Sequence, residues 1–202
     1  MAITNPSGLH DVYGEPSERA RKKQLSALDT HCRNFIAHSP FCVLSTAGRD
    51  GRADASPRGD RPGFVAVLDE RRLLLPDRPG NNRVDSLRNV VENPHAGLLF
   101  FIPGVNETLR VNGTARIVTD AELLAPLAFQ GKAPKSGLLL DVEEVFLQCG
   151  KALIRCRLWD ASAQVDRAAF PTLGRMLADQ IGGMDADATD HALDEVYRET
   201  LY

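Results

Sequence analysis

The sequence predicts a mainly β protein with flanking helices, built around a small antiparallel β-barrel. Between residues 41 and 147 it contains five to seven short apolar or alternating stretches, most of them joined by hairpin-like turns. Strands do not alternate with long helices, which argues against a doubly wound sheet. We therefore expect a single domain over residues 1–202, with an N-terminal helix at about 16–38 and a helical tail at about 168–202.

The N-terminal helix is predicted to begin at Pro16 and Ser17 and to run to about Ala37. Its apolar residues recur at helical spacing and form one stripe, which comprises Leu25, Leu28, Cys32, Phe35 and Ile36. The simplest role for such a stripe is to cover one face of a sheet.

The first predicted hairpin joins a strand at residues 41–46 to a second strand through Asp50 and Gly51, a strong turn pair. The second strand contains Pro57, which cannot donate a backbone hydrogen bond. That proline predicts a position at a sheet edge or at a bulge. Another hairpin follows, with strands at residues 63–68 and 72–75.

Apolar runs and alternation mark the later strands. Residues 95–102 are apolar, whereas residues 107–118 alternate, which predicts a strand with one buried face. The remaining predicted elements are a brief helix at 121–127, a last strand at 138–147 and a helical tail from Pro171.

Composition and charge argue against several classes of function. The net charge is −3 and the pI is near 6.0, so the molecule as a whole lacks a basic surface for nucleic acid. No apolar run approaches the ~20 residues that span a bilayer, and the N-terminus lacks a secretory pattern, so we expect a cytoplasmic protein. The four cysteines and five histidines show no ligand spacing, so we expect no metal site.

The segment from Arg78 to Pro94 carries the strongest functional signal. It predicts a loop and then a short helix, with Asn82 as N-cap and Asp85 in a capping-box position. Arg83 falls in the first turn, where a cation is unfavourable unless an anion such as a phosphate binds the N-terminal amides. A solvent-exposed arginine explains the segment equally well.

Common nucleotide-binding and hydrolase motifs are absent from the sequence, which has no GxGxxG, Walker or GxSxG pattern. An ordered set of other motifs resembles the pyridoxamine 5′-phosphate oxidase-related flavoproteins, especially their FMN-dependent branch of unassigned activity. The matching stretches lie between Tyr13 and Asp160 and read YGEPSERA, DASPRGD, LPDRPGNNRVDSLRN, ETLRVNG and KALIRCRLWD.

The resemblance implies a split β-barrel of Greek-key type and a homodimer with two FMN molecules in clefts between the subunits. Within the second strand, Ser56 and Arg58, with the adjacent Gly59, match the strand that contacts FMN in the family. Pro76 and Asp77 match the strand end that lies along the flavin ring.

Further matches concern the phosphate and the second subunit. Asn82 and Arg83 match the pair that holds the FMN phosphate, and Thr108 and Arg110 match positions that reach the cofactor from a neighbouring strand. The segment from Lys151 to Trp159 is the expected contribution of the second subunit.

Physical chemistry agrees with this assignment. An FMN phosphate is largely dianionic, so guanidinium groups and helix amides suit it. The pyrimidine end of the reduced flavin favours positive charge, which Arg110 or Lys151 could supply. Asp54 and Asp60 can simply be partners that orient the arginines.

For two of these residues a purely structural role is the alternative. Arg110 can be an outward-facing strand residue paired with Glu107 or Asp141. Trp159 can equally pack in the core without touching a flavin.

The chain also departs from the family. Authentic pyridoxamine phosphate oxidases end in an Arg-Leu-His-Asp-Arg run that binds substrate and flavin, where this chain has an acidic helical tail. The difference argues against vitamin B6 oxidation. We expect an FMN-binding oxidoreductase without an assigned catalytic residue. The alternatives are a flavin or phosphorylated-ligand carrier, a reductase that uses the deazaflavin F420, and a barrel whose anion site has degenerated.

Overall fold

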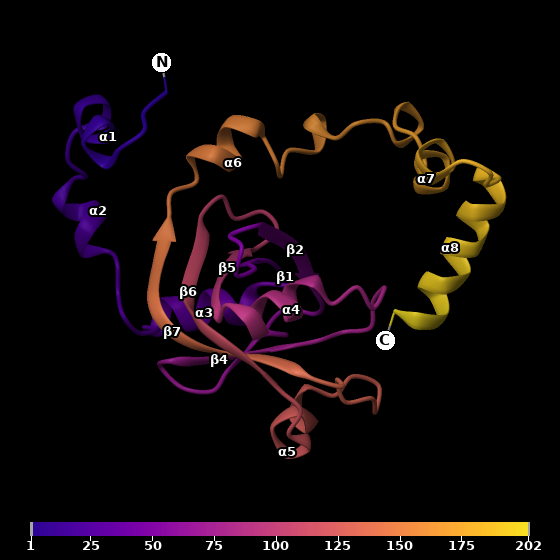
Figure 1. The fold of residues 1–202 in the computed structure, drawn as a ribbon, viewed down its shortest axis with the longest axis horizontal. Coiled ribbons are helices and arrows are strands. Elements are labelled where there is room, and N and C mark those ends of the chain that lie inside the picture. Colours follow the sequence, from indigo (N-terminus) through magenta and orange to yellow (C-terminus); the bar gives the residue numbers. More distant parts are fainter. Residues whose placement is uncertain (1, 202) are drawn as a thin grey trace.

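The computed structural model describes residues 2–201 and contains a seven-stranded antiparallel sheet in the order β2-β1-β5-β6-β7-β4-β3 (Figure 1). Its strands are β1 (Phe41–Ala47), β2 (Ala53–Gly59), β3 (Ala66–Val67), β4 (Arg72–Pro76), β5 (His95–Phe101), β6 (Thr108–Val118) and β7 (Gly137–Gln148). The sheet curls but does not close, because β2 and β3 remain at its two edges. The predicted mainly β fold with an antiparallel split barrel is confirmed.

The β1–β2 hairpin follows the sequence closely. Phe41 pairs with Gly59 at one end and Ala47 with Ala53 at the other, and Gly51 in the turn has a φ of 80°. Glycine adopts that φ without steric cost. The strand with Pro57 is an edge strand, as predicted.

The core lies on the inner face of the curled sheet and is covered by the helix α3 (Thr30–His38). Asp29 caps this helix by accepting a hydrogen bond from the Cys32 amide at 2.8 Å. Cys32, Phe35 and Ile36 are its buried residues. They join the buried sheet residues Cys42, Leu44, Leu98, Phe100, Leu109, Val111, Leu140 and Val145.

The single helix predicted at about 16–38 is wrong. The structure has a short helix α2 (Glu18–Lys22) and a separate α3, with extended chain between them. Leu25 exchanges two backbone hydrogen bonds of 2.9 Å with Val145 in β7. These bonds use the amide and carbonyl that a helix would need internally, so the long-range pairing interrupts the helix.

β6 and β7 form the longest pair in the sheet, and their register shifts at Asn112 and Gly113. A side chain at Gly113 would overlap the carbonyl oxygen of Asp141 in β7. The bulge bends this part of the sheet. β7 can therefore pair with β6 along its length and also with β4 through residues 137–141.

The remaining helices flank the sheet or extend from it. The helix α4 (Asp85–Glu92) packs against β1, β2 and β6, and α5 (Ala121–Leu124) lies beside a 3-10 turn at the tip of the β6–β7 connection. The other helices are α1 (Pro6–Tyr13), α6 (Lys151–Cys156), α7 (Leu173–Ile181) and α8 (Ala186–Thr200). The predicted helical tail corresponds to α7 and α8.

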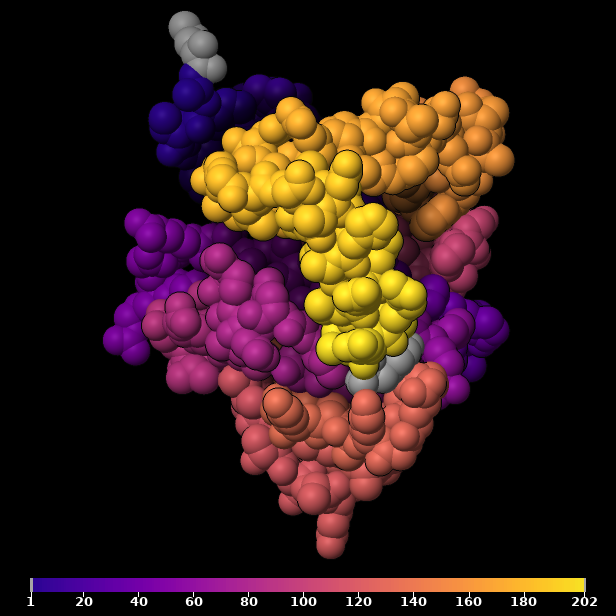
Figure 2. All heavy atoms as spheres, turned by 90° about the vertical axis from the view of Figure 1, so that its right-hand side faces the viewer, coloured from indigo at the N-terminus to yellow at the C-terminus, as the bar shows by residue number. Residues whose placement is uncertain are grey.

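Figure 1 shows two arms that leave the barrel in different directions. The N-terminal arm (residues 2–24) carries α1 and α2, and the C-terminal arm (residues 150–201) arches over the barrel and ends in α7 and α8. Figure 2 shows α8 on the outside of the molecule. Within residues 2–201, no helix has the length and apolar character to cross a bilayer.

Candidate functional site

The edge strand β2 presents a polar face toward the interior and α4. Arg58, Ser56 and Asp54 pair across the hairpin with Cys42, Leu44 and Thr46, whose side chains are buried. Residues that pair directly across antiparallel strands share one face of the sheet. The alternation of β2 therefore turns these three polar side chains inward, at the rim of the barrel that α4 covers.

A buried hydroxyl connects this face to α4. Ser86, in the first turn of α4, is only 2% exposed. Its hydroxyl accepts a hydrogen bond from Arg58 Nη2 at 3.2 Å and donates to Asp54 Oδ2 at 2.6 Å. The Ser56 hydroxyl also donates to Asp54, at 3.3 Å. Ser86 thus fixes the Arg58 guanidinium beside the start of the helix.

Both hydrogen-bond acceptors of Arg58 are uncharged. Besides the Ser86 hydroxyl, its guanidinium reaches the Pro57 carbonyl oxygen at 2.9 Å. The carboxylate of this network, Asp54, accepts from the hydroxyls and not from the guanidinium. The positive charge of Arg58 is therefore held in place without a direct carboxylate partner in this network.

The start of α4 differs from the prediction. The helix begins at Asp85, and Val84, not Asn82, occupies the N-cap position, in a left-handed conformation with a φ of 52°. Asn82 itself has a φ of 57°, so its side chain does not cap the helix. The predicted capping box between Asn82 and Asp85 is wrong. In the described part of the chain, no side chain caps α4.

Arg83 precedes the helix and does not lie in its first turn, which corrects a second detail of the prediction. Its Nε donates to Asp85 Oδ2 at 2.8 Å, and its side chain is 74% exposed. This contact raises the pKa of Arg83, which stays charged in any case. Arg83 therefore contacts the first residue of α4, Asp85, from the loop, and Arg58 contacts the second, Ser86, from the sheet.

The end of β4 lies near Arg58. Pro76 is buried, and the amide of the half-buried Asp77 donates to the Ser136 carbonyl oxygen at 3.0 Å. Burial raises the pKa of the Asp77 carboxyl, and the positive charges of Arg58 and Lys135 partly oppose that shift. The β2 edge, the end of β4 and the loop before β7 thus surround one region.

Three residues of this region were missed by sequence reasoning, namely Arg78, Ser86 and Lys135. Arg78 Nε donates to Asp60 Oδ2 at 2.7 Å, and the two side chains are 19% and 2% exposed. This pair bears out the expectation that Asp60 orients an arginine. No sequence signal pointed to Ser86 or Lys135, because the burial of Ser86 and the start of α4 at Asp85 are known only from the structure.

Thr108 and Arg110 lie on the opposite face of the sheet. Arg110 pairs with Leu99 in β5 and Phe146 in β7, whereas its neighbours Leu109 and Val111 are fully buried in the core. Thr108 is buried and donates to Gln148 Oε1 at 3.1 Å. Within one copy, the sheet therefore separates these two residues from Ser56 and Arg58.

Arg110 is held by a charged partner and a ring. Its Nη2 lies 3.0 Å from Glu144 Oε1, and its guanidinium carbon lies 4.2 Å from the centre of the Phe146 ring. The alternative of an ion pair is thus realised, but with Glu144 and not with Glu107 or Asp141. In the described residues, Arg110 Nε is buried and has no hydrogen-bond acceptor. A buried donor without an acceptor carries a free-energy cost that a ligand could remove.

The remaining predicted residues do not join either group. Gly59 ends β2 opposite Phe41, and Lys151 is exposed at the first position of α6. Trp159 is half-buried and donates from Nε1 to the Val105 carbonyl oxygen at 2.8 Å, which ties the C-terminal arm to the β5–β6 loop of its own chain.

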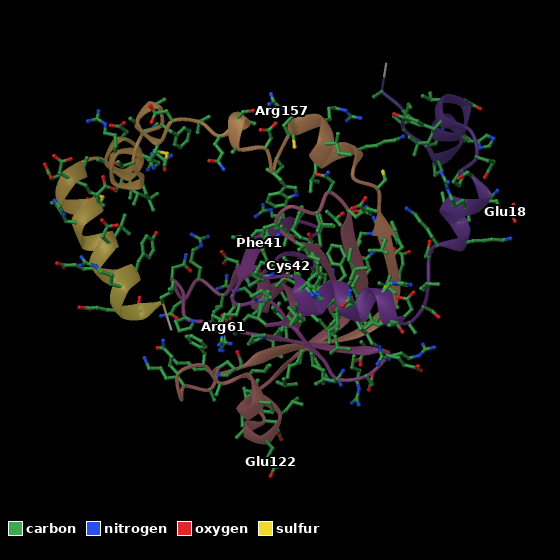
Figure 3. All side chains as sticks on the ribbon, turned by 180° about the vertical axis from the view of Figure 1, so that it is seen from behind. Glu18, Phe41, Cys42, Arg61, Glu122 and Arg157 are labelled. Carbon is green, nitrogen blue, oxygen red and sulfur yellow. The ribbon has the colours of Figure 1, made fainter. Side chains whose placement is uncertain are left out.

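Two surface hollows lie away from these residues. One is formed by the β3–β4 turn with Arg33 and Asp141, and the other lies within the C-terminal arm between Phe170 and Asp187. In Figure 3, Cys42 marks the part of β1 opposite Arg58, and Arg61 marks the rim beyond β2. The Arg61 guanidinium carbon lies 4.2 Å from the centre of the Phe129 ring, which links this rim to the loop before β7. No metal-binding group of histidine, cysteine and carboxylate residues occurs within residues 2–201.

Comparison with solved structures agrees with the fold. HupZ of Group A Streptococcus is 15% identical, covers 59% of this chain and 93% of its own, and gives a TM-score of 0.50. A protein of Lactobacillus delbrueckii that is provisionally described as a pyridoxamine 5′-phosphate oxidase is 20% identical. The match covers 60% of this chain and 99% of that protein, with a TM-score of 0.48. An FMN-binding protein of Syntrophomonas wolfei is 12% identical, and the match covers 58% of this chain and 83% of that protein, with a TM-score of 0.47.

The family comparison is more extensive. No curated protein matches the chain. The sequence profile described as pyridoxamine 5′-phosphate oxidase matches residues 28–149, which include all seven strands and α4 but neither arm. This range is more than half of the 202 residues. The chain therefore belongs to the pyridoxamine 5′-phosphate oxidase family.

Proposed function

We propose that this protein binds FMN at the β2–α4 edge and acts, as a homodimer, as an oxidoreductase that works through the bound flavin. The observation that carries the proposal is the Arg58 guanidinium, held at the start of α4 by the buried Ser86 hydroxyl. Its two hydrogen-bond acceptors are uncharged and no carboxylate forms an ion pair with it among the described residues, although its charge acts on the Asp77 carboxyl, so the guanidinium can still bind an anion. A phosphate ester that is largely dianionic fits such a donor.

The phosphate site would use both sides of the α4 start. Arg58 approaches from the sheet, while Asn82 and Arg83 approach from the loop before the helix. The amides of the first helical turn point out of the helix and add favourable partial charges. Arg83 is exposed and already contacts Asp85, so its contribution should be smaller than that of Arg58.

A second copy would complete the site. Ser56 and the end of β4 at Pro76 and Asp77 lie on the side of Arg58, whereas Thr108 and Arg110 lie across the sheet. Gly59 ends β2 next to Arg58. One FMN can contact both groups only if two copies each supply one of them. The buried Nε of Arg110 offers a donor that a flavin carbonyl could accept.

The C-terminal arm would add the remaining contacts from the second copy. Lys151 is exposed and could supply positive charge beside the flavin, and Trp159 could supply an apolar wall. FMN, when bound, provides the hydride or electron transfer, and the protein provides binding, orientation and electrostatics. We assign no protein acid or base to the reaction.

Reduction of the bound flavin tests the enzymatic part of the proposal. The purified protein, loaded with FMN, should be yellow and should lose its flavin absorbance when NADH or NADPH is added under anaerobic conditions. Mass spectrometry of the released chromophore should identify FMN. Loading with FMN but no reduction by either nucleotide would indicate a carrier. A chromophore identified as F420 would replace the cofactor in the proposal, and a protein that takes up no flavin would end it.

A further inference from the structure

The two arms carry apolar side chains that their own chain leaves uncovered. The helices α1, α2, α6 and α8 bury no residue in the described structure, and α7 buries only Gly174. The exposed apolar side chains of the C-terminal arm include Ile154, Phe170, Ile181, Val196 and Tyr197, and those of the N-terminal arm include Leu9, Val12 and Tyr13. Helices of this length are marginal in water unless a packed apolar face stabilises them.

The C-terminal arm packs mainly on itself. The amide of Gly174 in α7 donates to Asp190 Oδ1 in α8 at 2.7 Å, and a side chain at Gly174 would clash with the carbonyl oxygen of Ala186. The helices α7 and α8 therefore form a close hairpin, while their contacts with the barrel are sparse. The hairpin is therefore preformed, and the apolar side chains of Ile181, Val196 and Tyr197 on it are exposed.

One segment of each arm carries a net charge opposite to that of the other, although Arg21 and Lys22 also pair with Glu15 and Glu18 of their own chain. From residue 18 to residue 23, the N-terminal arm has four basic side chains and one carboxylate. From residue 185 to residue 199, the C-terminal arm has six carboxylates and one arginine. These segments are α2 with its C-cap and α8 with its N-cap. Opposite surface charges of this kind steer association and set its register.

The helices α2 and α8 of one chain lie on opposite sides of the barrel (Figure 1), so they do not meet within one copy. A two-fold rotation about an axis vertical in Figure 1 exchanges these sides. It would bring α2 of one copy to the side on which α8 of the other copy lies, and the reverse contact would follow by symmetry.

We propose that α8 of one copy docks on α2 of a second copy, so that two reciprocal arm contacts clasp the dimer. This inference rests on the homodimer of the proposed function. Both arms lie outside residues 28–149, the range that matches the family. The basic face of α2 would meet the carboxylates of α8, and the uncovered apolar side chains of the two arms would pack beside them.

Cross-linking of mixed isotopic copies tests the contact directly. Light and ¹⁵N-labelled full-length protein are unfolded, mixed and refolded, and then treated with a carbodiimide, which joins lysines to carboxylates. The expected products join Lys22 or Lys23 of one label to Asp194, Glu195 or Glu199 of the other. Links between these residues that occur only within one label, or links from α8 only to lysines of the barrel, would overturn the proposal.

Charge reversal provides the second test, with the dimer dissociation constant measured by sedimentation. Replacing Asp194 and Glu195 by lysine should raise that constant on the order of tenfold, and combining this with Arg21→Glu and Lys22→Glu should restore most of it. Glu122→Lys, on the exposed α5 at the far tip (Figure 3), is the matched control and should change little.

The two tests separate this inference from the proposed function. A monomeric wild-type protein would contradict the homodimer itself, and with it the arm contact. A dimer that forms with unchanged affinity in the charge-reversed variants would leave the homodimer intact and overturn only the arm contact.

Discussion

Arg58 and Arg110 occupy opposite faces of the sheet and are held in different ways. Arg58 donates to a serine hydroxyl and a backbone carbonyl, both uncharged. Arg110 lies against the carboxylate of Glu144 and the ring of Phe146, and its Nε is buried without an acceptor among the described residues. The Arg58 guanidinium can therefore offer its positive charge to an anion. The charge of Arg110 is balanced by Glu144, so Arg110 offers mainly a hydrogen-bond donor, its Nε. In the proposed site, the FMN phosphate would therefore lie near Arg58 and an uncharged flavin acceptor near Arg110.

The largest expected effect is on FMN affinity in Arg58→Ala. Loss of a hydrogen bond to a charged group costs about 1.5–3 kcal/mol, which corresponds to a dissociation constant roughly 10- to 150-fold larger. Titration of FMN with the protein, followed by flavin fluorescence, measures it. Arg49→Ala, an exposed arginine in the β1–β2 turn, is the control. Equal affinities for Arg58→Ala and wild type would remove Arg58 from the phosphate site.

Ser86→Ala should lower the free energy of unfolding by about 1–3 kcal/mol, because it leaves polar groups of the half-buried Asp54 and Arg58 without their shared partner. Urea unfolding of the protein without FMN measures the change. Ser45→Ala, on an exposed position of β1, should stay within about 0.5 kcal/mol of wild type. A Ser86 variant as stable as this control would mean that the network does not fix Arg58.

The salt dependence of FMN binding should differ between the two arginines. Removing Arg58 should flatten the dependence of affinity on ionic strength, because its charge acts on the phosphate. Removing Arg110 should weaken binding but keep the slope. A double-mutant cycle for Arg110 and Glu144 should give a coupling of about 0.2–1 kcal/mol, the range for partly exposed pairs. If the dependence of FMN affinity on ionic strength became equally flat in both variants, the different roles assigned to Arg58 and Arg110 would be wrong.

Asp77 gives the smallest effect, a dependence of stability on pH. Burial raises its pKa, so the native state keeps the proton at pH values where the unfolded chain has lost it. The free energy of unfolding should therefore fall as pH rises from about 3.8, the ordinary value, through the native pKa. Asp77→Asn has no carboxyl to titrate, so its free energy of unfolding lacks this decrease. Across that pH range, the stability of the wild-type protein should therefore decrease relative to that of the variant. Urea unfolding at a series of pH values checks it, and a constant difference between the two proteins would argue against a raised pKa.

Local patterns predicted the strands well. The alternation of residues 107–118 predicted β6 (Thr108–Val118), and Pro57 predicted an edge strand, because both signals depend on a few neighbouring residues. The helix predicted at 16–38 failed because Leu25 pairs with Val145, which is distant in sequence. The start of α4 was misplaced because Asn82 and Val84 adopt left-handed conformations that no local residue type demanded.

The candidate site was harder to predict than the strands. Arg58 and the α4 start could be named from sequence, but the hydroxyl of Ser86 that joins them could not, since a serine in a helix has many roles. Whether Arg58 and Arg110 share a face depends on the register of β1, β2, β5 and β6 across the sheet. No single segment contains that information, so the separation of the two arginines emerged only from the structure.

The most direct test compares FMN with riboflavin, which differ only in the phosphate. The account predicts that wild type binds FMN much more tightly than riboflavin and that Arg58→Ala loses most of this difference while its affinity for riboflavin stays unchanged. Equal affinities of the wild-type protein for the two flavins, or a preference for FMN that survives in Arg58→Ala, would contradict a phosphate site at the β2–α4 edge.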